Sequence, residues 1–279
     1  MNHRIKNNAA RTLVYLVLIL ACVVAVFPIV WMCIIAFKAP TESVSGFQSL
    51  VINDFTTGNI ARLMEIIPFA TNFKNSLLST LGGTITTLFF CSLAGFGFAK
   101  YKFPGRNGLF YFVIATMLIP PEVGSVPLFI IMRQLGLINS LWSLIIPRMA
   151  TAVGIFYMRQ YIMEVPDSLV EAARIDGCNE FKIYYSIILP VIKPAIASWA
   201  VLTVVARWND FFWPLLFLRK SSSYTLMVSL SMLPFSEGMS TPWPVIMAGT
   251  MIITLPVVLV YLLMQVYMKA GITEGAVKG

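Results

Sequence analysis

Long apolar runs without an ionisable side chain constrain this chain more than any other feature. The first run, Thr12–Phe37, contains no Asp, Glu, Lys or Arg. A helix needs roughly 20 apolar residues to cross the hydrocarbon core of a bilayer. The run is too long for a cleaved signal peptide, and no small-x-small cleavage site follows it near Lys38. We therefore expect Thr12–Phe37 to span a membrane.

The composition is also that of a membrane protein. Hydrophobic residues make up 58% of the 279 residues, charged residues make up 11%, and the mean hydropathy is +0.82. A soluble domain is roughly half apolar and about a quarter charged. We predict an all-α integral membrane protein with six transmembrane helices, at 12–37, 75–99, 108–120 (continuing to about 132 past Pro120-Pro121), 141–161, 195–217 and 245–268. Close helix packing in the second span is expected at Gly82, Gly83, Gly95 and Gly97.

Most basic residues fall on one side of this six-span arrangement. They are Arg4, Lys6, Arg11, Lys100, Lys102, Arg106, Arg159, Arg174, Lys182, Lys193, Lys269 and Lys278. Cytoplasmic loops carry an excess of Lys and Arg, so both termini and the loop after the fourth span are expected in the cytoplasm. The net charge of +8 is interpreted as this loop bias, and no nucleic-acid partner is expected. On the other side, residues 38–74 are expected to form one or two short helices, and the apolar stretch Leu226–Leu233 predicts a packed outer loop.

The charged loop after the fourth span is predicted to begin with a short helix. Ser168 and Glu171 have the Ser-x-x-Glu spacing of a capping box. Gly177 is expected to end the helix in the left-handed conformation, which a residue without Cβ adopts freely. A narrow face of small and apolar side chains, suited to lying against another protein, is expected from Leu169, Ala172 and Ala173.

A second short helix is predicted to follow the glycine. Pro190 is expected to stop it, and Pro194 is tolerated in the first turn of the next span. Its apolar face, at positions i, i+3, i+4 and i+7, is formed by Phe181, Tyr184, Tyr185 and Ile188. An alternative for both helices is an amphipathic hairpin that lies on lipid headgroups.

The same loop resembles the cytoplasmic coupling loop of ABC-importer permeases, which docks on the ATPase subunit. The pattern Glu-Ala-Ala, three residues, Gly, nine residues, Ile-x-Leu-Pro is met at seven positions. Cys178 departs from the family, where Ala is usual. The resemblance implies that the ATPase-coupling residues are Glu171, Ala172, Ala173, Asp176, Gly177, Ile187, Leu189 and Pro190.

Softer resemblances extend over nearly the whole chain and point to the sugar-uptake branch of type I importers. They lie at Ala99–Arg106, Ile119–Leu128, Leu135–Asn139 and Trp208–Leu215, and the ending Gly271–Gly279 is similar to the smaller, maltose-type permease subunit. The implied fold is a five-span type I permease core plus an N-terminal span. The implied domains are 1–37 (tail and first span), 38–71 (extracytoplasmic segment), 72–268 (core, with the coupling loop at 164–194) and 269–279 (cytoplasmic tail).

The resemblance also implies partners in a bacterial inner membrane. They are a second related permease subunit, two ATP-binding subunits, an extracytoplasmic sugar-binding protein and the lipid bilayer. No G-x-x-x-x-G-K-[ST] motif, metal-ligand cluster or activated nucleophile occurs in the sequence, so we expect no cofactor and no catalytic residue in this chain. ATP and Mg are expected on the partner subunits. The outer loop Arg219–Pro244 is expected to contact the binding protein, and the tail Lys269–Gly279 either lies along the ATPases or is a solvated end.

Charges within the apolar spans are the default place to look for a transport pathway. Asn209 and Asp210 are the predicted pathway residues, because an amide and a carboxylate beside aromatic rings suit a sugar. The alternative is an ion pair between Arg207 and Asp210 at i, i+3 that satisfies only itself. Glu122 and Arg148 are further candidates for internal pairing.

Three classes of function remain to be separated at this point. The pattern favours a permease subunit of an ABC importer for a sugar, with another small polar solute as the alternative substrate. A secondary transporter or channel lacks the repeated halves expected of many such folds and leaves the coupling loop unexplained. A membrane-embedded enzyme lacks a catalytic constellation.

Overall fold

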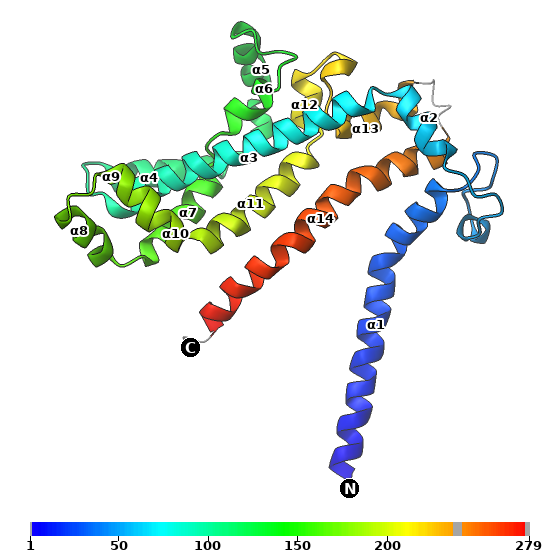
Figure 1. The fold of residues 1–279 in the computed structure, drawn as a ribbon, viewed down its shortest axis with the longest axis horizontal. Helices are drawn as coiled ribbons and strands as arrows, with labels where there is room; N and C mark the ends of the chain where they lie inside the picture. The colour runs from blue at the N-terminus through cyan, green and yellow to red at the C-terminus, as the bar shows by residue number, and fades with distance from the viewer. Residues whose placement is uncertain (1, 237–241, 277–279) are drawn as a thin grey trace. The chain divides into compact units, whose positions relative to one another are not determined.

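A computed structural model describes residues 2–236 and 242–276, with side chains for 11–234, 242–263 and 265. It contains only helices and one isolated bridge in the described part (Figure 1). Contacts divide the chain into unit 1 (Met1–Ile67, Leu230–Leu255) and unit 2 (Pro68–Ser229, Pro256–Gly279). The elements are α1 (Asn2–Ala36), η1 (Phe47–Leu50), α2 (Gly58–Ile66), α3 (Phe69–Lys100), α4 (Arg106–Thr116), η2 (Pro121–Gly124), α5 (Ser125–Gln134), α6 (Trp142–Ile145), η3 (Ile146–Arg148), α7 (Ala152–Glu164), α8 (Asp167–Ile175), α9 (Glu180–Ile183), η4 (Tyr184–Ile188), α10 (Leu189–Val191), α11 (Lys193–Trp208), α12 (Phe212–Phe217), η5 (Ser221–Ser223), α13 (Leu226–Ser236) and α14 (Trp243–Ala276).

Three of these helices are long and apolar enough to cross a membrane by themselves: Arg11–Ala36, Phe69–Lys100 and Trp243–Leu263. Two bent pairs pass the same test when each is taken as one span: Arg106–Thr116 with Pro121–Gln134, bent by 90°, and Glu180–Val191 with Lys193–Trp208, bent by 79°. The described residues therefore contain three candidate spans, or up to five. The predicted total of six is not reached.

The fourth and fifth predicted spans are not single helices. In the fourth, η3 contains Pro147, and a new helix starts after Thr151, whose Oγ1 accepts a hydrogen bond from Gly154 N (3.2 Å). In the fifth, α11 ends at Trp208, and Asp210 Oδ1 accepts from Trp213 N (3.3 Å) at the start of α12. The predicted spans over 141–161 and 195–217 thus contain breaks that the sequence analysis did not predict, because polar caps inside the apolar runs begin new helices.

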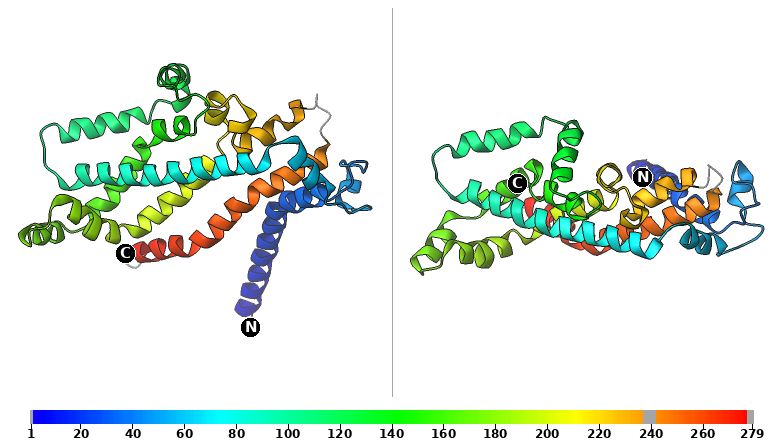
Figure 2. Two further views of the ribbon diagram at one scale, coloured as in Figure 1. Left: turned by 45° about the horizontal axis from the view of Figure 1, so that its top comes forward. Right: turned by 90° about the horizontal axis from the view of Figure 1, so that it is seen from above.

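In unit 2, α3 runs alongside α7 and α11 in Figures 1 and 2. Cys91, Met158 and Ile162 are buried at the contact between α3 and α7. A Cβ placed on Gly95 would lie 2.9 Å from Arg159 N and 2.9 Å from the Met158 Cβ. The close approach predicted for this glycine is confirmed. Gly97 has no atom within 4 Å of such a Cβ, so the same prediction is wrong there.

In unit 1, the outer segment contains η1 and α2, as predicted, and is organised around a buried lysine. Lys38 is fully buried, and its Nζ donates to Gln48 O and Val51 O, both at 2.7 Å. Glu42 lies 3.4 Å from the same Nζ and accepts from the backbone N–H groups of Asn53 (3.1 Å) and Asp54 (2.9 Å). These backbone bonds, together with Lys38, lower the pKa of Glu42 from 4.5 to about 2. The apolar side chains of α1, by contrast, are largely exposed, as suits a lipid-facing helix.

The Gly95 contact predicts a difference between two alanine variants of one helix. Gly95→Ala is expected to destabilise unit 2 by about 1–3 kcal/mol, because the added methyl overlaps the α7 backbone. Gly97→Ala is the matched control. It is expected to be neutral or stabilising by up to about 1 kcal/mol, because alanine favours helix more than glycine does. Thermal unfolding of the detergent-purified variants measures both. Equal melting temperatures would contradict the packing of α3 on α7.

The Glu42 contacts predict a pH-dependent stability. A carboxyl whose pKa is lower in the folded state stabilises the fold above its ordinary value of 4.5, and this contribution is lost as the pH falls toward 2. Glu42→Gln should therefore lower the melting temperature at pH 7 and lower it less at pH 3. Glu65→Gln, at a side chain that is 71% exposed, is the control and should show no such change. A Glu42→Gln effect of the same size at both pH values would rule out this role.

Candidate functional site: the loop after α7 and a buried arginine pair

The first helix of the loop, α8, begins two residues earlier than the predicted capping box at Ser168 implies. Its N-cap is Pro166, and no side chain caps it, so the predicted capping box of Ser168 and Glu171 is wrong. The Asp167 carboxylate instead accepts a hydrogen bond from Lys100 Nζ (2.6 Å), which comes from the end of α3. This hydrogen bond and the lysine charge hold the pKa of Asp167 below its usual range. An ion pair to a distant helix therefore replaces the local cap.

The end of α8 is the glycine turn that the sequence predicts. Gly177 has φ = +76°, in the left-handed region. Cys178 N donates to Ala173 O (3.0 Å) and Gly177 N donates to Arg174 O (3.1 Å), which together form a Schellman motif. No atom lies within 4 Å of a Cβ placed on Gly177, so the backbone conformation alone requires glycine here.

The second helical stretch is longer and more irregular than predicted. Asn179 caps α9 by accepting from Lys182 N (2.8 Å), and a π-helical turn, η4, follows. Pro190 lies in the first turn of α10 and does not stop the helix, which bends at Ile192. Pro194 lies in the first turn of α11, as predicted. Pro190 does not end the helix because α10 starts only at Leu189, and proline is compatible with a first helical turn.

Packing divides the predicted coupling residues into an inner and an outer set. Ala173 is buried in one cluster with Val170, Ile183, Tyr184 and Ile188, so it supports the loop from within. Ile187 and Leu189 pack partly against that cluster. The exposed members of the predicted set are Glu171, Ala172, Asp176, Gly177 and Pro190.

The predicted apolar face of the second helix is split by the π turn. Tyr184 and Ile188 point inward, and the Tyr184 hydroxyl lies 2.7 Å from Ser92 Oγ on α3. Phe181 and Tyr185 are 62% and 68% exposed. Sequence reasoning did not single out Ile175, which is 87% exposed at the end of α8. The signal for it was its position on the face opposite Val170 and Ala173.

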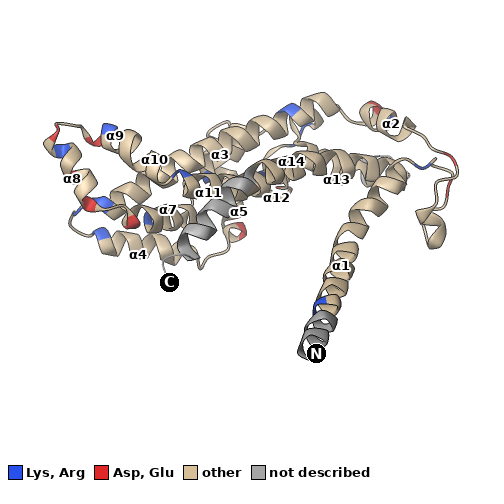
Figure 3. Ribbon diagram, turned by 60° about the horizontal axis from the view of Figure 1, so that its bottom comes forward, with Lys and Arg blue, Asp and Glu red and all other residues tan. Residues whose placement is uncertain are grey.

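Salt bridges and hydrogen bonds hold the two halves of the loop to each other and to the end of α3. Arg174 donates to both carboxylate oxygens of Glu180, at 2.8 and 3.2 Å, and the Tyr101 hydroxyl donates to Glu180 Oε2 at 2.5 Å. Lys100 Nζ also donates to Val165 O (2.5 Å). Figure 3 shows charged segments gathered around α8, α9 and the start of α4. The loop is thus a rigid, charged surface with isolated apolar side chains.

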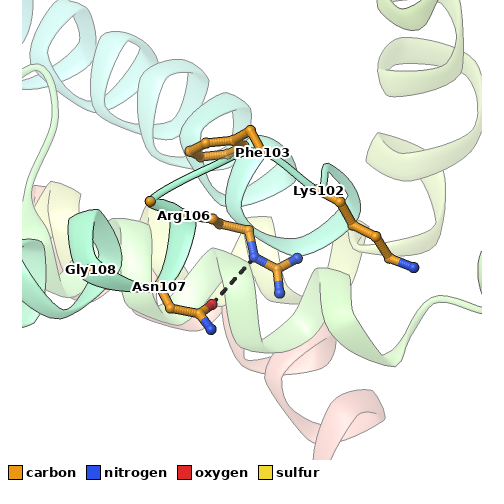
Figure 4. Close-up of a pocket in the computed structure, with 6 residues that line it drawn as sticks. Lys102, Phe103, Arg106, Asn107 and Gly108 are labelled. Atoms are coloured by element: carbon orange, nitrogen blue, oxygen red, sulfur yellow. Dashed lines mark hydrogen bonds between the residues drawn. The ribbon is translucent and has the colours of Figure 1, made fainter.

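One surface pocket joins this loop to the turn after α3, and a second pocket shares Lys102 with it. One, of about 270 Å³, is lined by Lys100, Tyr101, Lys102, Asp167, Val170, Glu171 and Arg174. The other, also about 270 Å³, lies at the turn itself, where Arg106 Nη1 donates to Tyr101 O (3.0 Å). Figure 4 shows the second hydrogen bond of this guanidinium, from Arg106 Nε to Asn107 Oδ1 (3.4 Å). Two stretches that resemble the family separately in sequence, Ala99–Arg106 and the loop, therefore form one surface.

The intramembrane charges pair differently from the prediction. Asp210 forms an ion pair with Arg148, whose Nη2 lies 2.6 Å from its Oδ2. Arg207 instead donates to Leu144 O (3.1 Å), Arg148 O (2.8 Å) and Thr87 Oγ1 (2.8 Å). The i, i+3 pair of Arg207 with Asp210 is therefore wrong, because α11 ends between the two residues and turns them apart.

The two predicted pathway residues occupy different environments. Asn209 is exposed, whereas the Asp210 side chain is only 8% exposed. Glu122, the other candidate for internal pairing, is exposed. Next to the Arg148–Asp210 pair lies a cavity of about 300 Å³, which the sequence did not predict. It is lined by Thr87, Arg148, Thr151, Trp199, Leu202, Thr203, Ala206 and Arg207.

Comparison with known proteins places these features in a family. Residues 91–274 match the family described as the binding-protein-dependent transport system inner membrane component. The chain is 34% identical to the arabinooligosaccharides transport system permease protein AraQ of Halalkalibacterium halodurans, with 92% of each chain covered. It is 32% identical to the lactose transport system permease protein LacG of Rhizobium radiobacter, with 95% of each covered.

A solved structure agrees over the whole fold. A chain of a bacterial ABC transporter involved in the import of the acidic polysaccharide alginate superimposes with a TM-score of 0.82 at 26% identity. The match covers 94% of this chain and 97% of that one. The chain therefore belongs to the binding-protein-dependent transport system inner membrane components, the integral membrane permease subunits of ABC importers, and is not itself an enzyme.

Proposed function

We propose that this permease carries a sugar or an oligosaccharide across a bacterial inner membrane, driven by ATP hydrolysis on separate subunits. The observation that carries the proposal is the rigid loop α8–α10, which presents charged and apolar side chains at the end of α3. The carbohydrate substrate is inferred from the arabinooligosaccharide, lactose and alginate systems of the similar proteins. Another small polar solute remains the second candidate.

The membrane arrangement that we propose has six spans with both termini in the cytoplasm. The span missing from the five candidates is the fourth along the chain, and it would combine α6, η3 and α7, which lie in the order expected of a broken helix. The basic residues of the α3–α4 turn and of α8–α10 support this orientation, since they gather at one end of unit 2 (Figure 3). The proposed domains keep the sequence boundaries: 1–37, 38–71, 72–268 and 269–279.

ABC importer permeases work with ATPase and substrate-binding partners. For this chain we propose a second related permease, two ATP-binding subunits that hold ATP and Mg, and an extracytoplasmic sugar-binding protein. The loop Arg219–Pro244 is proposed to contact the binding protein. Its residues 237–241 lie outside the described part of the chain. The tail 269–279 continues α14 as far as Ala276, and its side chains lie outside the described part.

The proposed coupling surface combines an outer and an inner layer. Glu171, Ala172, Asp176, Gly177 and Pro190 would face the ATPase, together with the exposed Ile175, Phe181 and Tyr185. Ala173, Ile187 and Leu189 would transmit movement to α3 and α7 through the cluster that they share with Tyr184 and Ile188. Because the loop is bonded to Lys100 and Tyr101, a push on α8 would reach α3 directly.

Two measurements test the proposed function directly. Cells that express the chain with its neighbouring transport genes should take up a radiolabelled oligosaccharide, and cells that lack this chain should not. The ATPase subunit should also co-purify with the affinity-tagged chain. Uptake that persists after inactivation of the ATPase would point to a secondary transporter and overturn the proposal.

The left-handed glycine predicts a coupling defect. Gly177→Val should strain the turn by about 1–2 kcal/mol and tilt α8, because a β-branched residue disfavours positive φ. Transport is expected to be lost while the protein remains in the membrane. Gly177→Asn is the matched control and should retain more transport, because asparagine tolerates this conformation. Wild-type uptake by Gly177→Val would remove Gly177 from the coupling mechanism.

The exposed isoleucine predicts a docking contact. Ile175→Ser should reduce the amount of ATPase subunit that co-purifies, because an apolar side chain buried at the interface would be lost. Phe47→Ser is the matched control: Phe47 is 91% exposed, but it lies in the segment proposed to face the other side. Equal recovery of the ATPase with both variants would place the docking contact elsewhere.

A further inference from the structure

The cavity between α3, η3 and α11 lies beside an excess of positive charge. Two guanidinium groups, Arg148 and Arg207, line it, and no acidic residue does. Among the described residues, the one carboxylate that pairs with either arginine is that of Asp210, bound to Arg148. One positive charge is therefore left without a negative partner in an apolar part of the molecule. An ionisable group in such a place is a default candidate for a ligand pathway.

The two arginines have different tasks. Arg207 is 9% exposed, and its guanidinium is used in three hydrogen bonds to Leu144 O, Arg148 O and Thr87 Oγ1. These neutral acceptors satisfy its donors but leave its charge in place. The Arg148 side chain is 27% exposed, and in the described part of the chain its one recorded partner is Asp210. Arg148 therefore has donors left for a ligand in the cavity.

Trp199 adds an aromatic ring to the lining of the cavity. Trp199 stacks on Tyr157, with ring centroids 5.0 Å apart, which holds the indole in place. Its buried Nε1–H has no hydrogen-bond partner in the described part of the chain. This nitrogen lies beside Gly154, 3.0 Å from where a Cβ on that residue would be, so Trp199 contributes its ring and not this donor to the cavity. The volume of about 300 Å³ is at the lower end of small-molecule pockets and suits one sugar ring.

We propose that this cavity binds sugars that carry a negative group, such as the carboxylate of a uronic acid, in preference to neutral sugars. The carboxylate would face the spare donors of Arg148, where the unbalanced charge lies, and the ring would lie against Trp199. This inference rests on the proposed function, because it names the class of sugar that the permease accepts. It is independent of the coupling surface.

The test compares galacturonate with galactose. The two sugars differ at one carbon, which is a negatively charged carboxylate in galacturonate and a neutral hydroxymethyl group in galactose. The complex of this chain with its partner subunits is purified in nanodiscs of neutral lipid, without the binding protein, and each radiolabelled sugar is titrated by equilibrium dialysis. Galacturonate should bind at least about tenfold more tightly than galactose. Acetate should not compete at equal concentration. Competition by acetate as strong as that by galacturonate would reduce the site to one for simple anions and overturn the sugar assignment.

A series of charge variants connects the preference to these residues. Asp210→Asn makes the net charge beside the cavity more positive. It should therefore increase the ratio of the dissociation constant for galactose to that for galacturonate. Arg148→Gln removes the excess charge and should bring the ratio close to one. Arg133→Gln, the same change at an exposed position on α5, is the control and should leave the ratio unchanged. If Arg148→Gln does not assemble, the wild-type and Asp210→Asn ratios still decide the question.

Equal affinity for both sugars in the wild type, or no change of the ratio in Asp210→Asn, would overturn the inference. Uptake of a neutral oligosaccharide would then still support the proposed function. Failure to bind either sugar would also overturn the inference, and the uptake and co-purification experiments would decide separately whether the chain is a sugar permease.

Discussion

The hydrogen bonds of Arg207 are the interaction on which the membrane part of unit 2 depends. Both α6–η3 and the end of α11 interrupt helices in an apolar setting, where unpaired carbonyls are unfavourable. The guanidinium of Arg207 satisfies the carbonyls of Leu144 and Arg148 from across the bundle. The Arg148 side chain reaches back to Asp210, just beyond the end of α11. The break at α6–η3 and the break at the end of α11 thus stabilise each other. The cavity lies beside both breaks and is lined by the two arginines that connect them.

At the end of unit 2 where α3 stops, short-range bonds hold the α8–α10 loop. Lys100 and Tyr101 bind its two halves, and Tyr184 and Ile188 fill the space beneath it. The loop therefore forms one body with α3 and α7. This rigidity is what a mechanical coupling element requires, because a flexible loop would absorb a push instead of passing it on.

Much of the local architecture was accessible from the sequence. The glycine turn at Gly177, the position of Pro194 in the first turn of α11 and the short helices of segment 38–74 were predicted from residue chemistry alone. The capping box at Ser168 and the helix stop at Pro190 were not correct. At Ser168, the ion pair of Asp167 with Lys100 prevailed over a local capping preference that is worth only about 1 kcal/mol. At Pro190, a new helical segment starts at Leu189, so the proline lies in a first turn. The split of the aromatic face followed from a π turn, which has no reliable sequence signature.

The sequence by itself determined the class of molecule, since long uncharged apolar runs and the Glu-Ala-Ala loop pattern depend only on residue type and spacing. It also indicated the family, because the residues of the loop pattern stand at the spacing that the family uses. Only the tertiary structure decided which charges meet. Arg148 and Asp210 are 62 positions apart, and Arg207 and Thr87 are 120 apart. Such pairs depend on how helices cross and where they break, and no local pattern of residues contains that information.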